Sequence, residues 1–314
     1  MTALWILIAV ILFAALIWSF CEWCYRFIFG RGKQRSFDEM DLSRTYYAPY
    51  TDRLLEAMAQ MKALPYEKLD MISRDGLSLK ALYHSQGSGH CIVFVHGYRA
   101  TPFNNFSCVS RDVMEAGYDL FFPIQRAHGE SEGNRITLGQ LEQQDLLDWL
   151  DVLNRTYAPE SIVLYGLSMG ATTVALISDR LPENVRSMVL DCGYPSLYER
   201  IKGRFRSTYV PFPGFFTRVI NLMVRKRMGF DMHETDARKA LQRTRVPALF
   251  FHGTGDRFVT PKEGKKLIDA CASEKEVHFV EGAPHALSYM AGKEETKNLV
   301  LAFLKRTDSI QTKK

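Results

Sequence analysis

The residue with the clearest potential for chemistry is Ser168, which stands between two glycines in the pentapeptide GLSMG at 166–170. A β-branched, apolar segment precedes it at 161–165, and small apolar residues follow at 171–177. This pattern predicts a nucleophile elbow, a sharp strand-to-helix turn that presents the serine hydroxyl. Glycines are expected there because larger side chains would collide with the helix or a neighbouring strand. On this motif alone, a turn whose serine merely caps the helix remains an alternative.

An acid and a base follow Ser168 in the chain. Asp256 comes after the segment ALFFHGTG, and His285 comes after VHFVEGAP. A histidine would take the serine proton and return it to the leaving group, while an aspartate would fix the imidazole tautomer and stabilise the imidazolium. We therefore predict a catalytic triad of Ser168, Asp256 and His285. Asp191, directly after the segment SMVL, is the alternative acid.

Acyl transfer also needs two backbone N–H donors for the negative charge that develops on the carbonyl oxygen. The predicted donors are Tyr98, which follows a strand and a glycine in FVHGY, and Met169, which directly follows the nucleophile. An ordinary tight turn is the alternative for FVHGY. The remaining strand-end or turn histidines are expected to hold loops by hydrogen bonds: His96, His128 and His252. No cofactor or metal is expected for this chemistry. Cys21 and Cys24 form a C-x-x-C, but there is no second pair or nearby histidine, so a metal or redox role for them is not expected. Acylation of these two cysteines stays open.

The elements that must position these residues read as strands alternating with amphipathic helices, which indicates a mostly parallel sheet covered on both faces. Helical patterns include TDRLLEAMAQMKAL, LEQQDLLDWLDVLN and PKEGKKLIDACA. The first two strands are expected to form an antiparallel hairpin. The predicted strands are Leu69–Ile72, Leu77–Tyr83, Cys91–Val95, Asp119–Pro123, Ile162–Tyr165, Ser187–Leu190, Ala248–Phe251 and Val277–Val280.

These motifs, in this order, resemble the α/β-hydrolase superfamily, and in particular its membrane-anchored bacterial-type serine hydrolases. The resemblance covers about 68–306 and also rests on FFPIQRAHGESEG, GQLEQQDLLDWL, VLDCGYPS, HGTGDRFVTP and EGAPHAL. It implies an eight-stranded α/β-hydrolase fold with a helical lid insertion. In relatives, the segment that corresponds to FFPIQRAHGESEG commonly contains D-x-R-x-H-G-x-S. Ile124 stands here in place of the aspartate, and this departure leaves the triad untouched. A serine nucleophile argues against the dehalogenase and epoxide hydrolase branches, which the resemblance implies use aspartate.

The N-terminal segment predicts a membrane anchor. Residues 1–21 contain no Lys, Arg, Asp or Glu, and the stretch is long enough to cross a bilayer as a helix of about 20 residues. A cleaved signal peptide is the alternative, but the basic n-region is missing. Arg26, Arg31, Lys33 and Arg35 follow the span, so the positive-inside rule predicts a single-pass cell-membrane protein with its catalytic domain in the cytoplasm. The expected domains are an anchor at 1–25, a connector and helix at 26–65, and a catalytic domain at 66–310 with a lid at about 196–245.

The lid is the one segment that informs on substrate. Between Arg200 and Phe230 the sequence has many Lys and Arg and no Asp or Glu. Phe215, Val219, Leu222 and Met223, with Phe216 and Ile220 beside them, predict an apolar stripe on a helix. Such a basic amphipathic helix could rest on anionic headgroups and shape an acyl pocket, or it could simply pack on the catalytic domain with solvated charges. Nucleic-acid binding is not expected, because no recognised motif accompanies the charge.

The sequence therefore predicts a serine hydrolase that cleaves carboxylic esters of lipophilic or medium-chain acyl groups through an acyl-enzyme on Ser168. Its expected partners are a small-molecule or lipid ester and the membrane. A serine peptidase acting on short peptides is one alternative, although the sequence offers no clear acidic anchor for a peptide amino terminus. A non-catalytic hydrolase-fold membrane scaffold is the other. Arg99, next to the proposed oxyanion turn, could meet a substrate carboxylate or phosphate, but a surface salt bridge is the favoured expectation.

Overall fold

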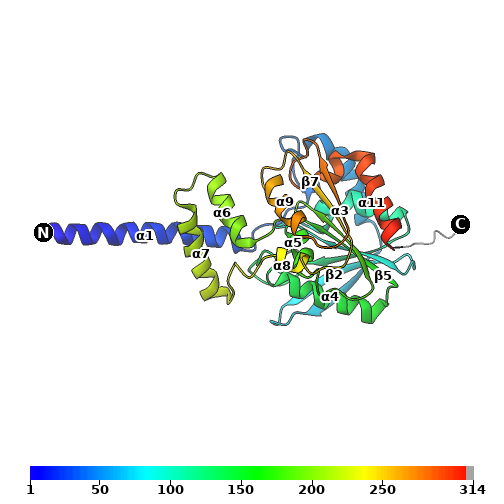
Figure 1. Ribbon diagram of the computed structural model, residues 1–314, viewed down its shortest axis with the longest axis horizontal. Coiled ribbons are helices and arrows are strands. Elements are labelled where there is room, and N and C mark those ends of the chain that lie inside the picture. The colour runs from blue at the N-terminus through cyan, green and yellow to red at the C-terminus, as the bar shows by residue number, and fades with distance from the viewer. Residues whose placement is uncertain (309–314) are drawn as a thin grey trace.

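A computed structural model describes residues 1–308 of the chain, built around one eight-stranded sheet (Figure 1). The strand order is β1-β2-β4-β3-β5-β6-β7-β8, in which β1 and β2 form an antiparallel hairpin, β2 pairs antiparallel with β4, and the other neighbours are parallel. This confirms the predicted fold. The strands are β1 Glu67–Ile72, β2 Ser78–His84, β3 His90–Val95, β4 Asp119–Ile124, β5 Ser161–Leu167, β6 Val185–Asp191, β7 Ala248–Gly253 and β8 Lys275–Val280.

Helices cover both faces of the sheet. One face packs against α2 Thr51–Lys62, α3 Pro102–Glu115, α10 Ser288–Ala291 and α11 Lys293–Asp308. The other face packs against α4 Glu142–Tyr157, α5 Met169–Leu176, α8 Arg238–Leu241 and α9 Pro261–Ala270. The last two residues of the predicted catalytic domain, 309–310, lie outside the described residues.

The side-chain alternation of the central strands explains this two-sided core. In β5, Ile162 and Leu164 belong to one apolar cluster, while Val163 and Tyr165 belong to the cluster on the opposite face. Successive residues of a strand point to opposite faces, so a strand that is buried on both sides must be apolar throughout. The strands from β3 to β8 all run in the same direction, so the loops at their carboxyl ends emerge at one edge of the sheet.

The N-terminal helix α1 is Thr2–Phe29, so it extends beyond residue 25, where the predicted anchor ended. It is long and apolar enough to cross a membrane, and it projects away from the body for most of its length (Figure 1). Its last third behaves differently, because Cys21, Cys24, Tyr25 and Phe29 are all buried. This end of α1 is therefore part of the folded body rather than a free stalk.

The partner of this buried end is the lid, which consists mainly of α6 Leu197–Ser207 and α7 Pro213–Met228 (Figure 1). Phe20 contacts Phe205 of α6 and Phe216 of α7, with ring centroids 6.5 and 5.1 Å apart. The predicted apolar stripe on α7 is only partly right. Phe215 and Leu222 are about half-exposed, whereas Ile220, Met223 and Val224 face the cluster, because α7 turns toward α1 and α6.

The connector between α1 and the sheet also lies on the body. It contains two short 3₁₀ helices, η1 Phe37–Glu39 and η2 Ala48–Tyr50. Asn104 on α3 fixes the connector, because its side-chain amide donates to the Arg35 carbonyl at 2.9 Å and accepts from the Phe37 amide at 3.1 Å. The chain thus passes over the carboxyl edge of the sheet before it enters α2.

Because the end of α1 is packed in the body, we expect a residue of this apolar helix, Phe29, to contribute to the stability of the folded protein. Phe29→Ala is expected to lower the free energy of unfolding of the full chain in detergent by about 3–5 kcal/mol, because it empties a fully buried site beside Tyr25. Denaturant titration would measure this change. Phe13→Ala on the exposed part of the same helix is the matched control and should change stability little. Equal effects of the two substitutions would contradict the docked arrangement.

Candidate active site

Ser168 occupies a strained turn between β5 and α5. Its backbone has φ 54° and ψ −113°, a conformation that side-chain-bearing residues rarely adopt. The flanking glycines are required by close approach: a Cβ on Gly166 would lie 2.6 Å from Ala171 Cα, and one on Gly170 would collide with the Val95 carbonyl oxygen. The local sequence therefore folds as the predicted elbow, which leaves the Ser168 hydroxyl at the carboxyl edge of the sheet.

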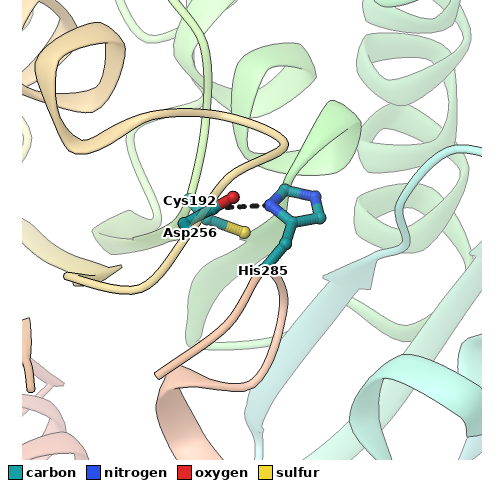
Figure 2. A group of neighbouring side chains, drawn as sticks. All are labelled: Cys192, Asp256 and His285. Carbon is teal, nitrogen blue, oxygen red and sulfur yellow. Dashed lines mark hydrogen bonds and ion pairs between the residues drawn. The ribbon is translucent and has the colours of Figure 1, made fainter. Parts of the chain in front are cut away.

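His285 lies between Ser168 and Asp256. It follows β8, and its Nε2 is 2.9 Å from Ser168 Oγ. Its Nδ1 is 2.6 Å from Asp256 Oδ2 (Figure 2). In the tautomer that satisfies both contacts, Nδ1–H donates to the carboxylate and Nε2 accepts from the serine hydroxyl. The three residues predicted as a triad are thus linked by two hydrogen bonds. Ser168 and His285 are 117 positions apart in the sequence, and Asp256 and His285 are 29 positions apart.

The loop after β7 holds Asp256 in place. Asp256 Oδ1 accepts hydrogen bonds from the amides of Phe258 and Val259 at 2.8 and 2.9 Å, which leaves Oδ2 to face His285. His252 supports the same loop by donating from Nε2 to the Val259 carbonyl at 2.9 Å. Burial lowers the pKa of His252, which keeps this imidazole neutral and structural.

The alternative acid, Asp191, lies elsewhere. It ends β6 and accepts a hydrogen bond from the Ser288 hydroxyl at 2.8 Å, and within residues 1–308 it makes no hydrogen bond to His285. Complete burial raises the pKa of Asp191 to about 7. The geometry therefore favours Asp256 as the partner of His285.

The two predicted oxyanion donors meet because their strands are neighbours. Tyr98 follows β3 and Met169 follows β5, and β3 and β5 pair in parallel with Val95 opposite Gly166. Met169 is the first residue of α5, where an amide has no acceptor within the helix. Across residues 1–308, neither the Tyr98 nor the Met169 amide donates a hydrogen bond to a protein acceptor. Both donors are thus available to a ligand at the carboxyl edge of the sheet.

Two buried histidines hold the turn that carries Tyr98. His96 Nε2 accepts from the Gln125 amide at 3.1 Å, and His128 Nε2 accepts from the Arg99 amide at 2.9 Å. Each ring donates through Nδ1 to a backbone carbonyl, that of Gly97 for His96 and that of Arg126 for His128. Burial lowers the pKa of His96 to about 4 and that of His128 well below its usual value, so each ring stays neutral and keeps one acceptor nitrogen. Both are structural, as expected.

The same turn is tied to the N-terminal helix α1. The Tyr98 hydroxyl donates to the Phe27 and Ile28 carbonyls at 3.1 and 2.8 Å, and the Arg99 guanidinium donates to the Phe27 and Gly30 carbonyls at 2.7 and 3.0 Å. Carbonyls at the C-terminus of a helix have no N–H donor within the helix, and these two side chains supply donors to them. The expected surface salt bridge of Arg99 is therefore wrong, because its charge caps α1 instead.

Cys192 lies beside Asp256 and His285, and the three ligand atoms are within 4.8 Å of one another (Figure 2). A metal would need the thiolate form of the cysteine. Burial and the neighbouring carboxylates raise the pKa of the Cys192 thiol well above its usual value, and the Asp256–His285 hydrogen bond already uses the facing atoms of the other two. The donor set thus suits a neutral thiol packed beneath the triad better than a metal ion.

A cleft of about 910 Å³ opens onto Ser168 and His285. Its walls come from the connector, the Tyr98 turn, the start of α3, α6 of the lid and the loops that carry Asp256 and His285. Apolar and aromatic side chains supply much of the lining: Phe37, Met40, Tyr46, Tyr47, Leu167 and Phe258. Phe258 packs against His285, and the two ring centroids are 4.9 Å apart.

Sequence reasoning missed the connector and Phe258 as parts of this cleft. The connector shows no strand or helix periodicity that would direct it to the site, so only the hydrogen bonds of Asn104 reveal its course. Phe258 offered a weak signal, because it lies two residues after the predicted catalytic acid.

Comparisons with known proteins agree with this architecture. Residues 91–233 match the family model described as the alpha/beta hydrolase fold. Protein YqkD of Bacillus subtilis is 23% identical over 68% of this chain and 70% of its own length, and human monoglyceride lipase is 21% identical over 72% and 86%. The structure of the Pyrococcus furiosus esterase Pf2001 superposes with a TM-score of 0.64 and 20% identity over 79% of this chain and 95% of its own.

The family match covers the elbow, the Tyr98 turn and the strands between them. The sheet order, with β2 as its one antiparallel strand among the described residues, extends the likeness to the rest of the body. The body of the chain therefore has the α/β-hydrolase fold.

Proposed function

We propose that this protein is a membrane-anchored serine hydrolase that cleaves carboxylic esters of lipophilic or medium-chain acyl groups. The observation that carries the proposal is the position of His285, hydrogen-bonded to both Ser168 and Asp256 in the wall of a large, partly apolar cleft. The α/β-hydrolase fold, with an esterase and a monoglyceride lipase among the similar proteins, supports hydrolase activity in general.

In the proposed reaction, Ser168 Oγ attacks the ester carbonyl carbon while His285 Nε2 takes the hydroxyl proton. The charge that forms on the carbonyl oxygen is stabilised by the amides of Tyr98 and Met169. The ester C–O bond then breaks, His285 returns the proton to the departing alcohol, and the acyl group remains on Ser168. Water attacks this acyl-enzyme by the same route in reverse, which releases the carboxylic acid and restores the serine.

The charge of the cleft lining disfavours the peptidase alternative. A peptide amino terminus is cationic at neutral pH. Within residues 1–308, the side chains that line the cleft include five Lys or Arg and no Asp or Glu. A positively charged substrate terminus would therefore be repelled at this entrance.

The anchor belongs to the same proposal. Helix α1 would hold the cleft next to a bilayer, where lipophilic esters concentrate, and the basic residues after the span favour the cytoplasmic side. Protease protection of the body in sealed vesicles of known orientation tests this assignment.

The direct test is turnover by the full-length chain in nonionic detergent. We expect hydrolysis of p-nitrophenyl acyl esters that varies with acyl length, and no cleavage of aminoacyl p-nitroanilides. A fluorophosphonate should label the protein at Ser168. Anilide cleavage in place of ester cleavage would favour the peptidase, and absence of both activities and of labelling in a folded protein would favour the scaffold.

A further inference from the structure

Four cations line the cleft and are here called the cationic rim: Lys33, Arg35, Arg204 and Arg257. They come from three separate parts of the chain, the connector, α6 and the loop after β7. All four are exposed. Arg99 also lines the cleft, but its guanidinium is bound to the carbonyls at the end of α1 and is not counted.

The charges of the rim are not neutralised by the protein. Within residues 1–308, none of the four forms a salt bridge. Nearby Arg200, by contrast, lies 3.6 Å from Glu263 and is buried. Lys266, outside the cleft, pairs with Glu199 at 2.7 Å, whereas no Asp or Glu among the described residues lines the cleft to pair with the four rim cations.

The rim is also held close to the reacting groups. Arg204 lies over the Phe258 ring, with Cζ 5.7 Å from its centroid, and Phe258 in turn packs on His285. On the connector, the Asn104 side chain holds the backbone of Arg35 by donating to its carbonyl. A cleft lined by charges of one sign focuses the electrostatic field and raises the local concentration of ligands of the opposite sign.

We propose that the ester cleaved at Ser168 carries a phosphate or carboxylate group, which the cationic rim binds while the acyl chain lies along the aromatic lining. This inference rests on the proposed esterase function and narrows its substrate class to anionic amphiphilic esters. The anionic group could belong to a lipid headgroup in the bilayer or to a soluble ester, and both would be recognised by the same cations.

The test compares two esters that differ only in a phosphate group, hexanoyl glycerol and hexanoyl glycerol phosphate, with the full-length chain in nonionic detergent. Released hexanoate is the readout. We expect kcat/KM to be about tenfold higher for the phosphate ester at low ionic strength, since several weakly screened charge pairs contribute. The preference should shrink near 1 M salt, where the Debye length is about 3 Å.

Variants assign the preference to the rim. Arg204→Gln combined with Arg257→Gln should bring the ratio of the two kcat/KM values close to one. Arg206→Gln is the matched control, because Arg206 is an exposed arginine of the same helix that does not line the cleft. Its ratio should stay at the wild-type value.

A second pair, palmitoyl glycerol and palmitoyl glycerol phosphate in phosphatidylcholine vesicles, distinguishes the two sources of the anionic group. A preference for phosphate in vesicles alone supports a lipid headgroup, and a preference in both formats also admits soluble esters. Equal or better hydrolysis of the neutral esters in both formats overturns the inference but leaves the esterase assignment intact. Failure to hydrolyse any of the four esters overturns both.

Discussion

Replacing Ser168 by alanine is expected to lower kcat for ester hydrolysis by about six orders of magnitude and to abolish fluorophosphonate labelling. The oxygen that would form the acyl-enzyme is removed, so His285 has no proton to accept and the remaining rate comes from substrate binding and the oxyanion donors alone. Alanine keeps the Cβ of serine, so the strained φ of 54° at this position is no more costly than before.

Ester assays on purified full-length protein, with circular dichroism to establish folding, measure this effect. Ser178→Ala is a suitable control, since Ser178 is also buried near the end of α5 and its hydroxyl has no hydrogen-bond partner among the described residues. Turnover by a folded Ser168→Ala protein at the wild-type rate would move the nucleophile elsewhere.

Asp256→Asn should reduce kcat by about four orders of magnitude while leaving the fold intact. An asparagine can still accept the amides of Phe258 and Val259 through its oxygen. Its NH₂ group would then face His285 Nδ1 and donate to it, which forces the proton onto Nε2, where the imidazole can no longer accept from Ser168. The loss would therefore appear in kcat and in the rate of labelling.

Asp191→Asn is the control for this experiment, because both aspartates are buried at strand ends. Asp191 has a pKa near 7 through burial, so it is substantially protonated at neutral pH, and asparagine resembles that form. We expect less than about a tenfold change in kcat, in line with a group that supports the site only through packing. A severe loss in Asp191→Asn together with a mild one in Asp256→Asn would reassign the acid.

Much of the fold could be predicted because it depends on local patterns. Every predicted strand has a counterpart in the sheet. The central strands in particular stand out from the amphipathic helices between them, because they are buried on both faces and mostly apolar. The elbow was predictable for a similar reason. Its two glycines are required because a Cβ at either position would collide with backbone a few residues away or on the neighbouring strand. The chain order of Ser168, Asp256 and His285 then followed from the loops after those strands, and their catalytic roles stay predictions.

The α7 stripe shows where such patterns stop. Phe215 and Leu222 have the spacing of a buried face, yet they are about half-exposed, because the helix turns toward α1 and the pattern does not specify its neighbour. Similarly, hydropathy predicted a membrane-spanning helix but could not indicate that the last third of this helix joins the lid cluster.

The sequence by itself thus determined the sheet, the elbow and the nature of the chemically competent residues, because each depends on the periodicity of apolar side chains or on local backbone geometry. Only the tertiary structure decided how α1 and the connector meet the site. Arg99 binds the carbonyl of Phe27 from 72 positions away, and three distant segments bring the cationic rim together around one cleft. Such contacts join backbone carbonyls and long side chains across the fold, and no local periodicity encodes which of them will meet.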